Sequence, residues 1–364
     1  MKRRSFVKSA GLGIAAAGAT AAVAAPAIAQ SMPKLTWRLA ASWPKVLDTL
    51  FGGAQHVATR VGEMSDGNFQ IRAFAGGEIV PPFQVLDAVQ NNTVELGHSA
   101  SYYYVGKDPT FTFDTTVPFG FNTRQQNAWM LHGGGLELMR DFFKGYNIYN
   151  IPAGNTGAQM GGWYRKEIKT VEDLKGLKFR IGGWAGAVLV KLGVVPQMIP
   201  GGDIYPSLEK GTIDAAEWVG PYDDEKLGFY KVAKYYYYPG WWEGNAQTSL
   251  YVNLDQWNKL PKNYQAMLTA ASLEADISMT AKYDADNPAA LRRLVANGTQ
   301  LRPFSKAILQ ACYKAAYELY DEEKARNPKF AKVYAPWLAF RNEEKLWFRV
   351  EEQQYDNFIY SERS

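Results

Sequence analysis

The 364-residue sequence predicts an α/β protein built as two lobes. Its length corresponds to about two domains of ordinary size. Strand-like and helix-like segments alternate over residues 35–98 and again over residues 179–218. Such alternation is typical of a mainly parallel sheet with helices on its faces, and two separate units favour two lobes over one large sheet.

In the first unit, the spacing of apolar residues changes with each expected element. Every second residue is apolar over 35–41, as in a half-buried strand, and the next segment has the 3.6-residue period of a helix. Asp-Gly at 66–67 ends that helix, and Pro-Pro at 81–82 opens the next one. The expected order is strand, helix, strand, helix, strand over 35–41, 47–64, 69–73, 81–89 and 94–98.

The second unit repeats this order. Its strands and helices are expected at 179–181, 184–192, 194–199, 204–210 and 213–218. Residues 89–95 and 208–214 also share a helix end, a polar turn, a threonine and a strand start. The two units therefore have similar local organisation.

From about residue 256 the chain is expected to be mainly helical and amphipathic. Near the end, large apolar residues share one broad helical face. They are Trp347, Val350, Tyr355, Phe358 and Ile359. We expect this face to pack on its own lobe, and the alternative is contact with a neighbouring subunit.

Composition excludes several classes of protein. Apolar residues make up 47% and charged residues 21%, which excludes disordered and low-complexity chains. Cys312 is the only cysteine, so a disulfide framework, a multi-cysteine metal site and a C-x-x-C-H haem attachment are excluded.

Residues 1–29 have the pattern of an export signal, with a basic start, an Ala/Gly-rich apolar run and a small-residue cleavage site near Ala29/Gln30. Arg3-Arg4 resembles a twin-arginine signal; a membrane anchor is the alternative. The formal charge is +4, and this segment carries four basic residues and no acids. The mature chain would therefore have no net charge and is expected in the periplasm, without a nucleic-acid partner. No later stretch reaches 18 apolar residues.

Sequence motifs of the common enzyme classes are absent. H-E-x-x-H, G-x-S-x-G, P-loop and G-x-G-x-x-G patterns do not occur in their required contexts. The acidic run 223–225 could suggest a cation site, but an acidic run in a turn with a proline is more often solvated. An exported two-lobed α/β chain without catalytic groups is typical of a binding protein rather than an enzyme.

The candidate functional residues cluster in the middle of the chain. Residues 154–163 pack small residues around two amides, and Arg180 lies near the end of an expected strand. Residues 201–218 end with an acid and an indole leaving a strand, and Trp-Trp-Glu-Gly follows at 241–244. Ligands of open α/β sheets collect at the carboxyl ends of strands.

These segments resemble the solute-binding receptors of TRAP transporters, the DctP-type family. The motifs are Leu-Lys-Gly-Leu-Lys-Phe-Arg from Leu174, the run 208–218 and Pro-Gly-Trp-Trp-Glu at 239–243. The last motif, with three tyrosines at 102–104, is similar to the subset that binds 2-oxo and 2-hydroxy monocarboxylates with a metal ion. The resemblance covers essentially the whole mature chain.

The resemblance implies a periplasmic-binding-protein-like fold with a long helix spanning both lobes and a helical C-terminal region. The expected divisions are 1–29 signal peptide, 30–153 lobe I, 154–246 lobe II, 247–336 return to lobe I with long connecting helices, and 337–364 C-terminal helix. It also implies delivery of the solute to the membrane subunits of a TRAP transporter, and a homodimer formed through the C-terminal helix.

By resemblance, Arg180 grips the substrate carboxylate, and its planar fork suits two parallel hydrogen bonds. Three residues match metal ligands: the Gln159 amide oxygen, the Glu217 carboxylate and the Trp218 main-chain carbonyl. Such hard oxygen donors fit Na⁺ or Ca²⁺. Further substrate-contacting positions, besides Gln159 and Trp218, are Glu243, Asn155 and Tyr103 or a neighbour as the roof.

The chemistry of a 2-oxo acid suits this set. One carboxylate oxygen and the keto oxygen form a five-membered chelate for a cation, while Arg180 binds the carboxylate. Glu217, Glu243 and the substrate bring three negative charges, which Arg180 balances together with Ca²⁺. With Na⁺, Glu243 must be protonated or paired elsewhere.

Each residue also has an ordinary structural interpretation: a surface ion pair for Arg180, a helix cap for Glu217 and core packing for Trp241-Trp242. Their joint occurrence in family order favours a receptor for a pyruvate-like acid. The alternatives are the same receptor for lactate, another 2-hydroxy acid, a dicarboxylate or a sugar acid, and, from another class, an exported oxidoreductase.

Overall fold

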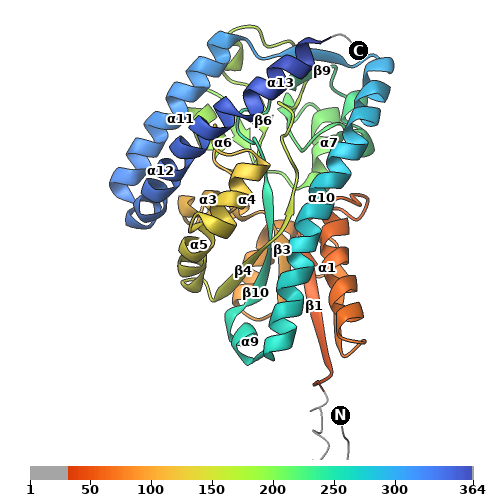
Figure 1. The fold of residues 1–364 in the computed structure, drawn as a ribbon. Helices are drawn as coiled ribbons and strands as arrows, with labels where there is room; N and C mark the ends of the chain where they lie inside the picture. Colours follow the sequence, from red (N-terminus) through yellow and green to blue (C-terminus); the bar gives the residue numbers. More distant parts are fainter. Residues whose placement is uncertain (1–31, 363–364) are drawn as a thin grey trace, which may run out of the picture. The chain divides into compact units, whose positions relative to one another are not determined.

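The computed structural model describes residues 32–362, and two mixed β-sheets organise them (Figure 1). The predicted export signal, residues 1–29, lies outside the described residues. Residues from Lys34 onward belong to one unit, within which each sheet forms one lobe.

The first lobe contains a five-stranded sheet of order β2-β1-β3-β10-β4. Its strands are β1 (Leu35–Ala41), β2 (Phe69–Phe74), β3 (Leu96–Ser99), β4 (Ile148–Asn155) and β10 (Gln247–Asn253). β1 pairs in parallel with β2 and β3, whereas β10 is antiparallel to β3 and β4. The first three strands match the unit predicted over residues 35–98, and β10 joins them from far along the chain.

Short helices surround the first sheet. They are α1 (Leu50–Met64), α2 (Val85–Gln90), α3 (Thr112–Thr115), α4 (Thr123–His132), α5 (Gly135–Lys144) and α9 (Leu254–Lys259), with 3-10 turns η1 (Pro82–Gln84), η2 (Ser101–Tyr104) and η3 (Pro109–Phe111). The face of α1 that carries Leu50, Ala54, Val57 and Val61 is buried. This spacing is the helical period on which the sequence prediction rested.

The second lobe contains a six-stranded sheet of order β11-β9-β5-β8-β6-β7. Its strands are β5 (Trp163–Tyr164), β6 (Lys178–Arg180), β7 (Val195–Gln197), β8 (Ala215–Ala216), β9 (Tyr235–Tyr238) and β11 (Gln300–Pro303). Its helices are α6 (Ala185–Val190), α7 (Gly201–Glu209) and α8 (Pro221–Leu227), with 3-10 turns η4 (Glu172–Leu174) and η5 (Phe229–Lys231). β6 runs parallel to β7 and β8, so the carboxyl ends of β6 and β8 meet at one edge.

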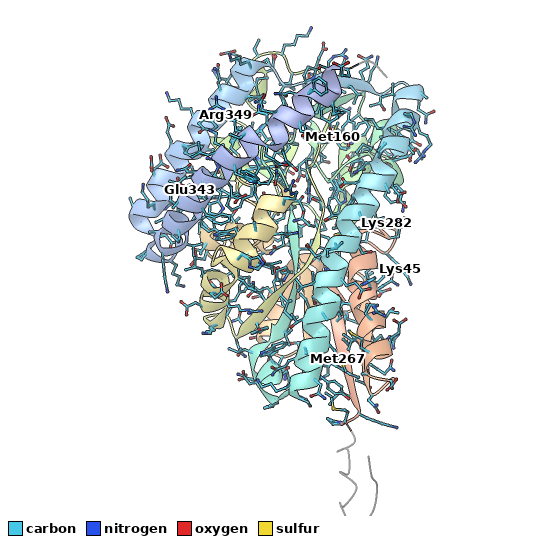
Figure 2. The ribbon with its side chains drawn as sticks, in the orientation of Figure 1. Lys45, Met160, Met267, Lys282, Glu343 and Arg349 are labelled. Atoms are coloured by element: carbon cyan, nitrogen blue, oxygen red, sulfur yellow. The ribbon has the colours of Figure 1, made fainter. Side chains whose placement is uncertain are left out.

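One helix spans both lobes. α10 (Lys262–Ala296) has 35 residues, or about 50 Å at 1.5 Å per residue. It packs on α1 and β4 of the first lobe and on α8 of the second. Met267 and Lys282 lie along it, and Lys282 is the one nearer to Lys45 of the segment before α1 (Figure 2).

Three helices end the described chain: α11 (Lys306–Arg326), α12 (Pro328–Val350) and α13 (Glu352–Ser361). α11 packs on α6 of the second lobe, and α12 packs on α4 and α5 of the first. The predicted two-lobed fold, with its long spanning helix and helical C-terminal region, is confirmed.

The apolar face at the C-terminus differs from our expectation. Trp347, Val350, Tyr355, Phe358 and Ile359 are between 45% and 70% exposed, and α13 has no buried residue. Within the described chain this face does not pack on its own lobe. The expectation was wrong because α13 continues from the end of α12 instead of turning back over the lobe (Figure 1).

The acidic run was also misjudged. Asp223 and Asp224 are fully buried in the first turn of α8, where hydrogen bonds replace water. Asp224 accepts hydrogen bonds from the Trp163 indole at 2.9 Å and the Tyr236 hydroxyl at 2.7 Å. Burial raises the pKa of Asp224 to about 7. The expected solvated turn is therefore a buried polar junction.

No helix among residues 32–362 is long and apolar enough to cross a membrane.

Candidate ligand-binding site

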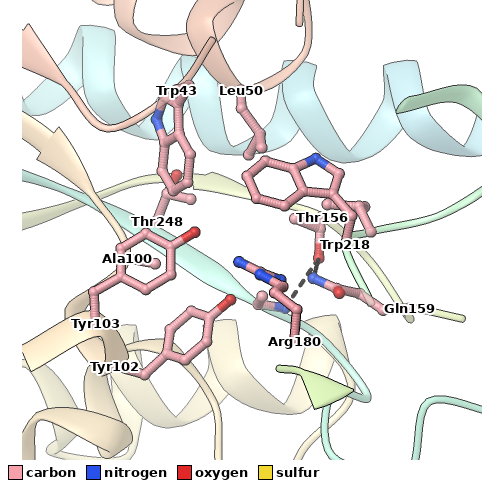
Figure 3. A pocket seen from close by; sticks show the side chains of 12 residues that line it. Trp43, Leu50, Ala100, Tyr102, Tyr103, Thr156, Gln159, Arg180, Trp218 and Thr248 are labelled. Atoms are coloured by element: carbon pink, nitrogen blue, oxygen red, sulfur yellow. Dashed lines mark hydrogen bonds between the residues drawn. The ribbon is translucent and has the colours of Figure 1, made fainter. Parts of the chain in front are cut away.

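A small pocket lies between the two lobes (Figure 3). Residues from both sheets and from the crossing segments line it. They are Trp43, Leu50, Ala100, Tyr102, Tyr103, Thr156, Gln159, Arg180, Trp218, Val219, Ala246 and Thr248. Four of these, Tyr103, Gln159, Arg180 and Trp218, were predicted from the sequence.

Arg180 is the last residue of β6 and is 1% exposed. Its Nε donates to the Ile199 carbonyl at 3.0 Å, and its Nη1 donates to the Glu217 carbonyl and to Glu217 Oε1, both at 2.6 Å. These three contacts hold the guanidinium in place. Its Nη2 is buried and has no hydrogen-bond partner within the described chain.

Glu217 lies next to Arg180 because it directly follows β8, which pairs in parallel with β6. Its Oε1 also accepts a hydrogen bond from the Gly182 backbone N–H at 2.6 Å. Its Oε2 is buried and unpartnered among residues 32–362. Burial raises the pKa of Glu217, and the Arg180 charge and the Gly182 N–H oppose that shift.

Gln159 and Glu243 come from the two segments that cross between the sheets. One lies between β4 and β5 and the other between β9 and β10, and they pair through their backbones. The Gln159 N–H donates to the Glu243 carbonyl at 3.0 Å. The Gln159 Nε2 donates to Thr156 Oγ1 at 3.1 Å, which directs its Oε1 away from that contact. Gln159 Oε1 and Glu243 Oε2 are both buried without a partner in the described part of the chain. Burial, and next the charge of Glu217, raise the pKa of Glu243 well above its ordinary value.

The donor set fits a hard cation. Buried oxygens of Gln159, Glu217 and Glu243 lack donors, and leaving such groups unpaired is costly in a folded protein. Amide and carboxylate oxygens are the ligands that Na⁺ and Ca²⁺ take. Among the described residues, Arg180 Nη2 is a buried donor without a partner in the same region, and it suits an anionic group. One site thus offers acceptors for a cation and a donor for an anion.

Two tyrosines of η2 cover the pocket from the first lobe. Tyr103 lines it, as predicted, and Tyr102 lies against Gly182 and Gly183 of the second lobe. A Cβ on Gly183 would lie 1.9 Å from Tyr102 Cδ2, and Gly183 has φ of +63°. Glycine at 183 therefore permits the close approach of the lobes.

Asn155 does not line the pocket. Its Oδ1 accepts from the Gly157 N–H at 3.0 Å and the Thr123 hydroxyl at 3.2 Å, and its Nδ2 donates to Asn245 Oδ1 at 3.1 Å. The side chain joins the two crossing segments next to β4 and β10. A direct contact with substrate stays a prediction for this residue.

The Trp241-Trp242 pair is part of the core. Trp241 stacks on Phe119 with ring centroids 5.0 Å apart, and Trp242 packs edge-on to Phe179 at 5.8 Å. Neither tryptophan lines the pocket, in line with the ordinary interpretation of this pair.

Sequence reasoning missed the wall formed by Trp43 and Leu50. Both come from the segment that follows β1. The rule that ligands gather at the carboxyl ends of strands applies to β1 as it does to β6, and it could have identified Trp43.

A second group of contacts joins the lobes beside the pocket. The Thr49 hydroxyl, at the start of α1, donates to Asp223 Oδ1 in α8 at 2.7 Å. The Tyr222 hydroxyl donates to Asp48 at 3.1 Å, and Lys226 forms an ion pair with Asp48. The two lobes are thus in contact at the N-terminal end of α1.

A family model for bacterial extracellular solute-binding proteins, family 7 (DctP), matches residues 40–327. The chain belongs to this family. The predicted resemblance to TRAP receptors is confirmed, and the protein is a solute-binding receptor with an extracytoplasmic location rather than an enzyme.

Three relatives of this DctP-family chain are informative about the ligand. A monocarboxylate 2-oxoacid-binding periplasmic protein of Nostoc sp. is 50% identical over 366 residues, covering 99% of this chain and 100% of the relative. A Bordetella bronchiseptica TRAP solute-binding protein is 55% identical with a TM-score of 0.90, covering 90% of this chain and 98% of its own. It is described as a mixed-occupancy dimer with calcium and picolinate in the active site.

The third relative is a TRAP periplasmic solute-binding protein of Pseudoalteromonas atlantica with bound sodium and pyruvate. It is 40% identical with a TM-score of 0.86, covering 89% of this chain and 99% of its own. The two structures therefore hold a small monocarboxylate together with either of the cations that the sequence suggested.

Proposed function

We propose that this protein is the receptor of a TRAP transporter and binds a small 2-oxo monocarboxylate of the pyruvate type together with Na⁺ or Ca²⁺. The observation that carries the proposal is a set of unpartnered buried atoms at the pocket and directly behind it. Gln159 Oε1 and Arg180 Nη2 belong to residues that line the pocket, and Glu243 Oε2 and Glu217 Oε2 belong to residues hydrogen-bonded to those two. The ligands of the Bordetella and Pseudoalteromonas relatives support it.

Each residue then has a role. Arg180 Nη2 donates to the substrate carboxylate, while its other nitrogens stay paired with Ile199 and Glu217. The Gln159 amide oxygen, Glu217 Oε2 and the Trp218 main-chain carbonyl hold the cation. A bound cation would distinguish a 2-oxo acid from a simple carboxylate, because the 2-oxo acid offers two oxygens that chelate the cation. Tyr103 closes the pocket from above, and Glu243 completes the polar wall.

The charge on Glu243 distinguishes the two cations. Burial, and next the charge of Glu217, raise the pKa of Glu243 above its ordinary value, a shift in the direction of the neutral side chain. A protonated Glu243 matches the charge balance with Na⁺, whereas Ca²⁺ balances an ionised Glu243. We infer that Glu243→Gln retains Na⁺-supported binding and weakens Ca²⁺-supported binding.

Substrate capture requires the lobes to open and close. The contacts of Thr49 with Asp223 and of Tyr102 with Gly183 belong to the closed form. Ligand that touches both lobes shifts the population toward closure, and the closed receptor delivers the acid to the membrane subunits of the transporter. The proposed lobes are residues 30–153 and 154–246, with 247–336 returning to the first lobe through long connecting helices. Within this last segment, β11 joins the sheet of the second lobe and α11 packs on α6.

We also propose export through a twin-arginine type signal that is cleaved near Ala29/Gln30, which places the mature protein in the periplasm. The exposed apolar residues of α12 and α13 support a homodimer through the C-terminal helix, residues 337–364. Trp347→Ala combined with Phe358→Ala should give monomers in sedimentation experiments. The matched control is Leu131→Ala, which changes an exposed apolar residue of α4.

Calorimetry on the mature protein tests the main proposal. Pyruvate, 2-oxobutyrate, lactate and succinate are titrated after chelation, and again with Na⁺ or Ca²⁺ restored. We expect cation-dependent binding of pyruvate, weaker binding of lactate and no binding of succinate. Binding of succinate but of no monocarboxylate would overturn the proposed ligand class.

A further inference from the structure

We propose that Trp43, positioned by the buried His98, sets the length of the carbon chain that the pocket accepts. The inference rests on the proposed binding of 2-oxo acids, because it concerns the part of the ligand that the polar groups do not bind.

The pocket has a polar and an apolar side. Arg180 and Gln159 lie on one side, and Trp43 and Leu50 lie across from them (Figure 3). In a 2-oxo acid the carboxylate and keto oxygens belong with the polar side. The alkyl group therefore has to face the apolar side, where the Trp43 indole limits the space.

His98 holds the indole in place from behind. Trp43 Nε1 donates a hydrogen bond to His98 Nδ1 at 2.7 Å, and both side chains are buried. The other ring nitrogen of His98 lies 3.0 Å from the Ala153 carbonyl oxygen. An indole N–H can only donate, so His98 Nδ1 must accept, and Nε2 carries the proton that it donates to Ala153.

This tautomer persists because His98 does not take a second proton near neutral pH. Burial lowers the pKa of His98 to about 4. The ring thus stays neutral and presents a permanent acceptor to Trp43. His98 lies in β3 and Ala153 lies in β4, so two strands of the first sheet fix the position of the acceptor.

Further contacts restrict Trp43 and its partner His98. Its ring centroid is 5.9 Å from that of Tyr103, and Thr248 Oγ1 lies 3.3 Å from His98 Nε2. Moving the indole aside for a longer chain would leave His98 Nδ1 buried without a donor. Trp43 is therefore a rigid wall rather than an adaptable one, and His98 is a positioning residue.

The experiment measures chain-length selectivity by calorimetry with pyruvate, 2-oxobutyrate and 2-oxovalerate on the mature protein with its cation. In Trp43→Leu the ratio of the Kd of 2-oxovalerate to that of pyruvate should fall at least about tenfold, because a larger space opens at the apolar side. Trp257→Leu is the matched control, since Trp257 is buried in the same lobe but stacks on Tyr149 and does not line the pocket.

Two His98 variants separate positioning from a general structural role. Asn can place an oxygen where His98 Nδ1 lies, so His98→Asn should keep the selectivity ratio of the wild type. His98→Leu removes the acceptor and should shift the ratio in the same direction as Trp43→Leu. Equal ratios in the Asn and Leu variants would overturn the role of His98.

Trp43→Phe provides a second test should Trp43→Leu not fold, because it keeps an aromatic ring but loses the N–H donor. It should accept 2-oxobutyrate better than the wild type does, relative to pyruvate. If the wild type binds pyruvate and both Trp43 variants keep the selectivity ratio of the wild type, this inference alone is overturned. A wild type that binds no 2-oxo acid overturns the proposed function instead.

Discussion

The second lobe and the first lobe contribute different chemistry to the two sides of the pocket. The second lobe brings Arg180 and Glu217, which are linked in a buried charge-assisted network at the ends of β6 and β8. The first lobe brings Trp43, Leu50 and Tyr103 from segments that follow β1 and β3. The charged side of the pocket would therefore recognise the functional groups of the ligand, and the apolar side would limit its size.

The two sides also differ in how each is held rigid. Arg180 is fixed by main-chain and carboxylate acceptors, so its remaining donor is available without further rearrangement. Trp43 is fixed by one neutral hydrogen bond and by ring contacts. Changes to the polar side should therefore affect affinity for every 2-oxo acid, whereas changes to the apolar side should affect selectivity among them.

The largest effect is expected from Arg180→Lys. A lysine has one nitrogen in place of three, so it cannot reach the Ile199 carbonyl, the Glu217 acceptors and a substrate carboxylate together. Hydrogen bonds to charged groups contribute about 1.5–3 kcal/mol each. Pyruvate binding should weaken about 100-fold in calorimetry, and by a similar factor for longer 2-oxo acids. Arg165→Lys, in a groove on the surface of the second lobe, is the matched control. Unchanged affinity in Arg180→Lys would remove Arg180 from the site.

Glu217→Gln is expected to have the next largest effect. The amide keeps an acceptor for Arg180 but loses the charge available to a cation. We expect about 30-fold weaker pyruvate binding at fixed Ca²⁺, equal to about 2 kcal/mol, and a higher Ca²⁺ requirement. Glu225→Gln is the control, because Glu225 pairs with Arg293 at the surface. Normal calcium content by elemental analysis in Glu217→Gln would contradict a ligand role.

Gly183→Ala tests whether ligand binding requires the close contact between Tyr102 of the first lobe and Gly183 of the second. The added methyl would clash with Tyr102 of the first lobe, and the positive φ costs about 1 kcal/mol more. Pyruvate affinity should fall about tenfold, while small-angle scattering should report a more open form with ligand present. Gly77→Ala is the control: its φ is +87°, but no atom lies within 4 Å of its Cβ position. A closed Gly183→Ala variant with normal affinity would show that the Tyr102 contact is dispensable.

The smallest effect is expected from Thr49→Val, which removes the donor to Asp223 without changing either side of the pocket. Loss of one hydrogen bond between the lobes should weaken the closed form by about 1 kcal/mol, or about fivefold in pyruvate affinity. The ratio among 2-oxo acids should stay that of the wild type. Thr269→Val is the control, because the Thr269 hydroxyl only bonds within α10. A changed ratio would mean that this contact also shapes the pocket.

Local sequence patterns predicted much of the fold because each reports on one element. The alternation in β1 and the helical period of α1 depend on neighbours within a few residues, and both elements formed where expected. The predicted strand at 213–218 shrank to the two residues of β8, since its end turns away to place Glu217 beside Arg180. The motifs around Arg180, Gln159 and Trp218 pointed to three residues that line the pocket in the structure.

Contacts between distant segments were outside the reach of those patterns. Asp223 was expected in water and is buried instead, because Thr49 and Tyr283 reach it from distant parts of the chain. Trp43 carries no motif, and its position in the pocket depends on His98 of β3 and Ala153 of β4. The apolar face of α13 could be recognised, but its exposure depends on where α12 ends.

The sequence by itself determined the export signal prediction, the alternation of elements, the family and the polar half of the candidate site, because those features depend on short stretches of chain. The tertiary structure alone decided that β10 pairs between β3 and β4, that an acidic run becomes a junction between lobes, and that Trp43 faces Arg180. These outcomes depend on pairing and packing between segments that lie far apart in the chain, for which local periodicity carries no signal.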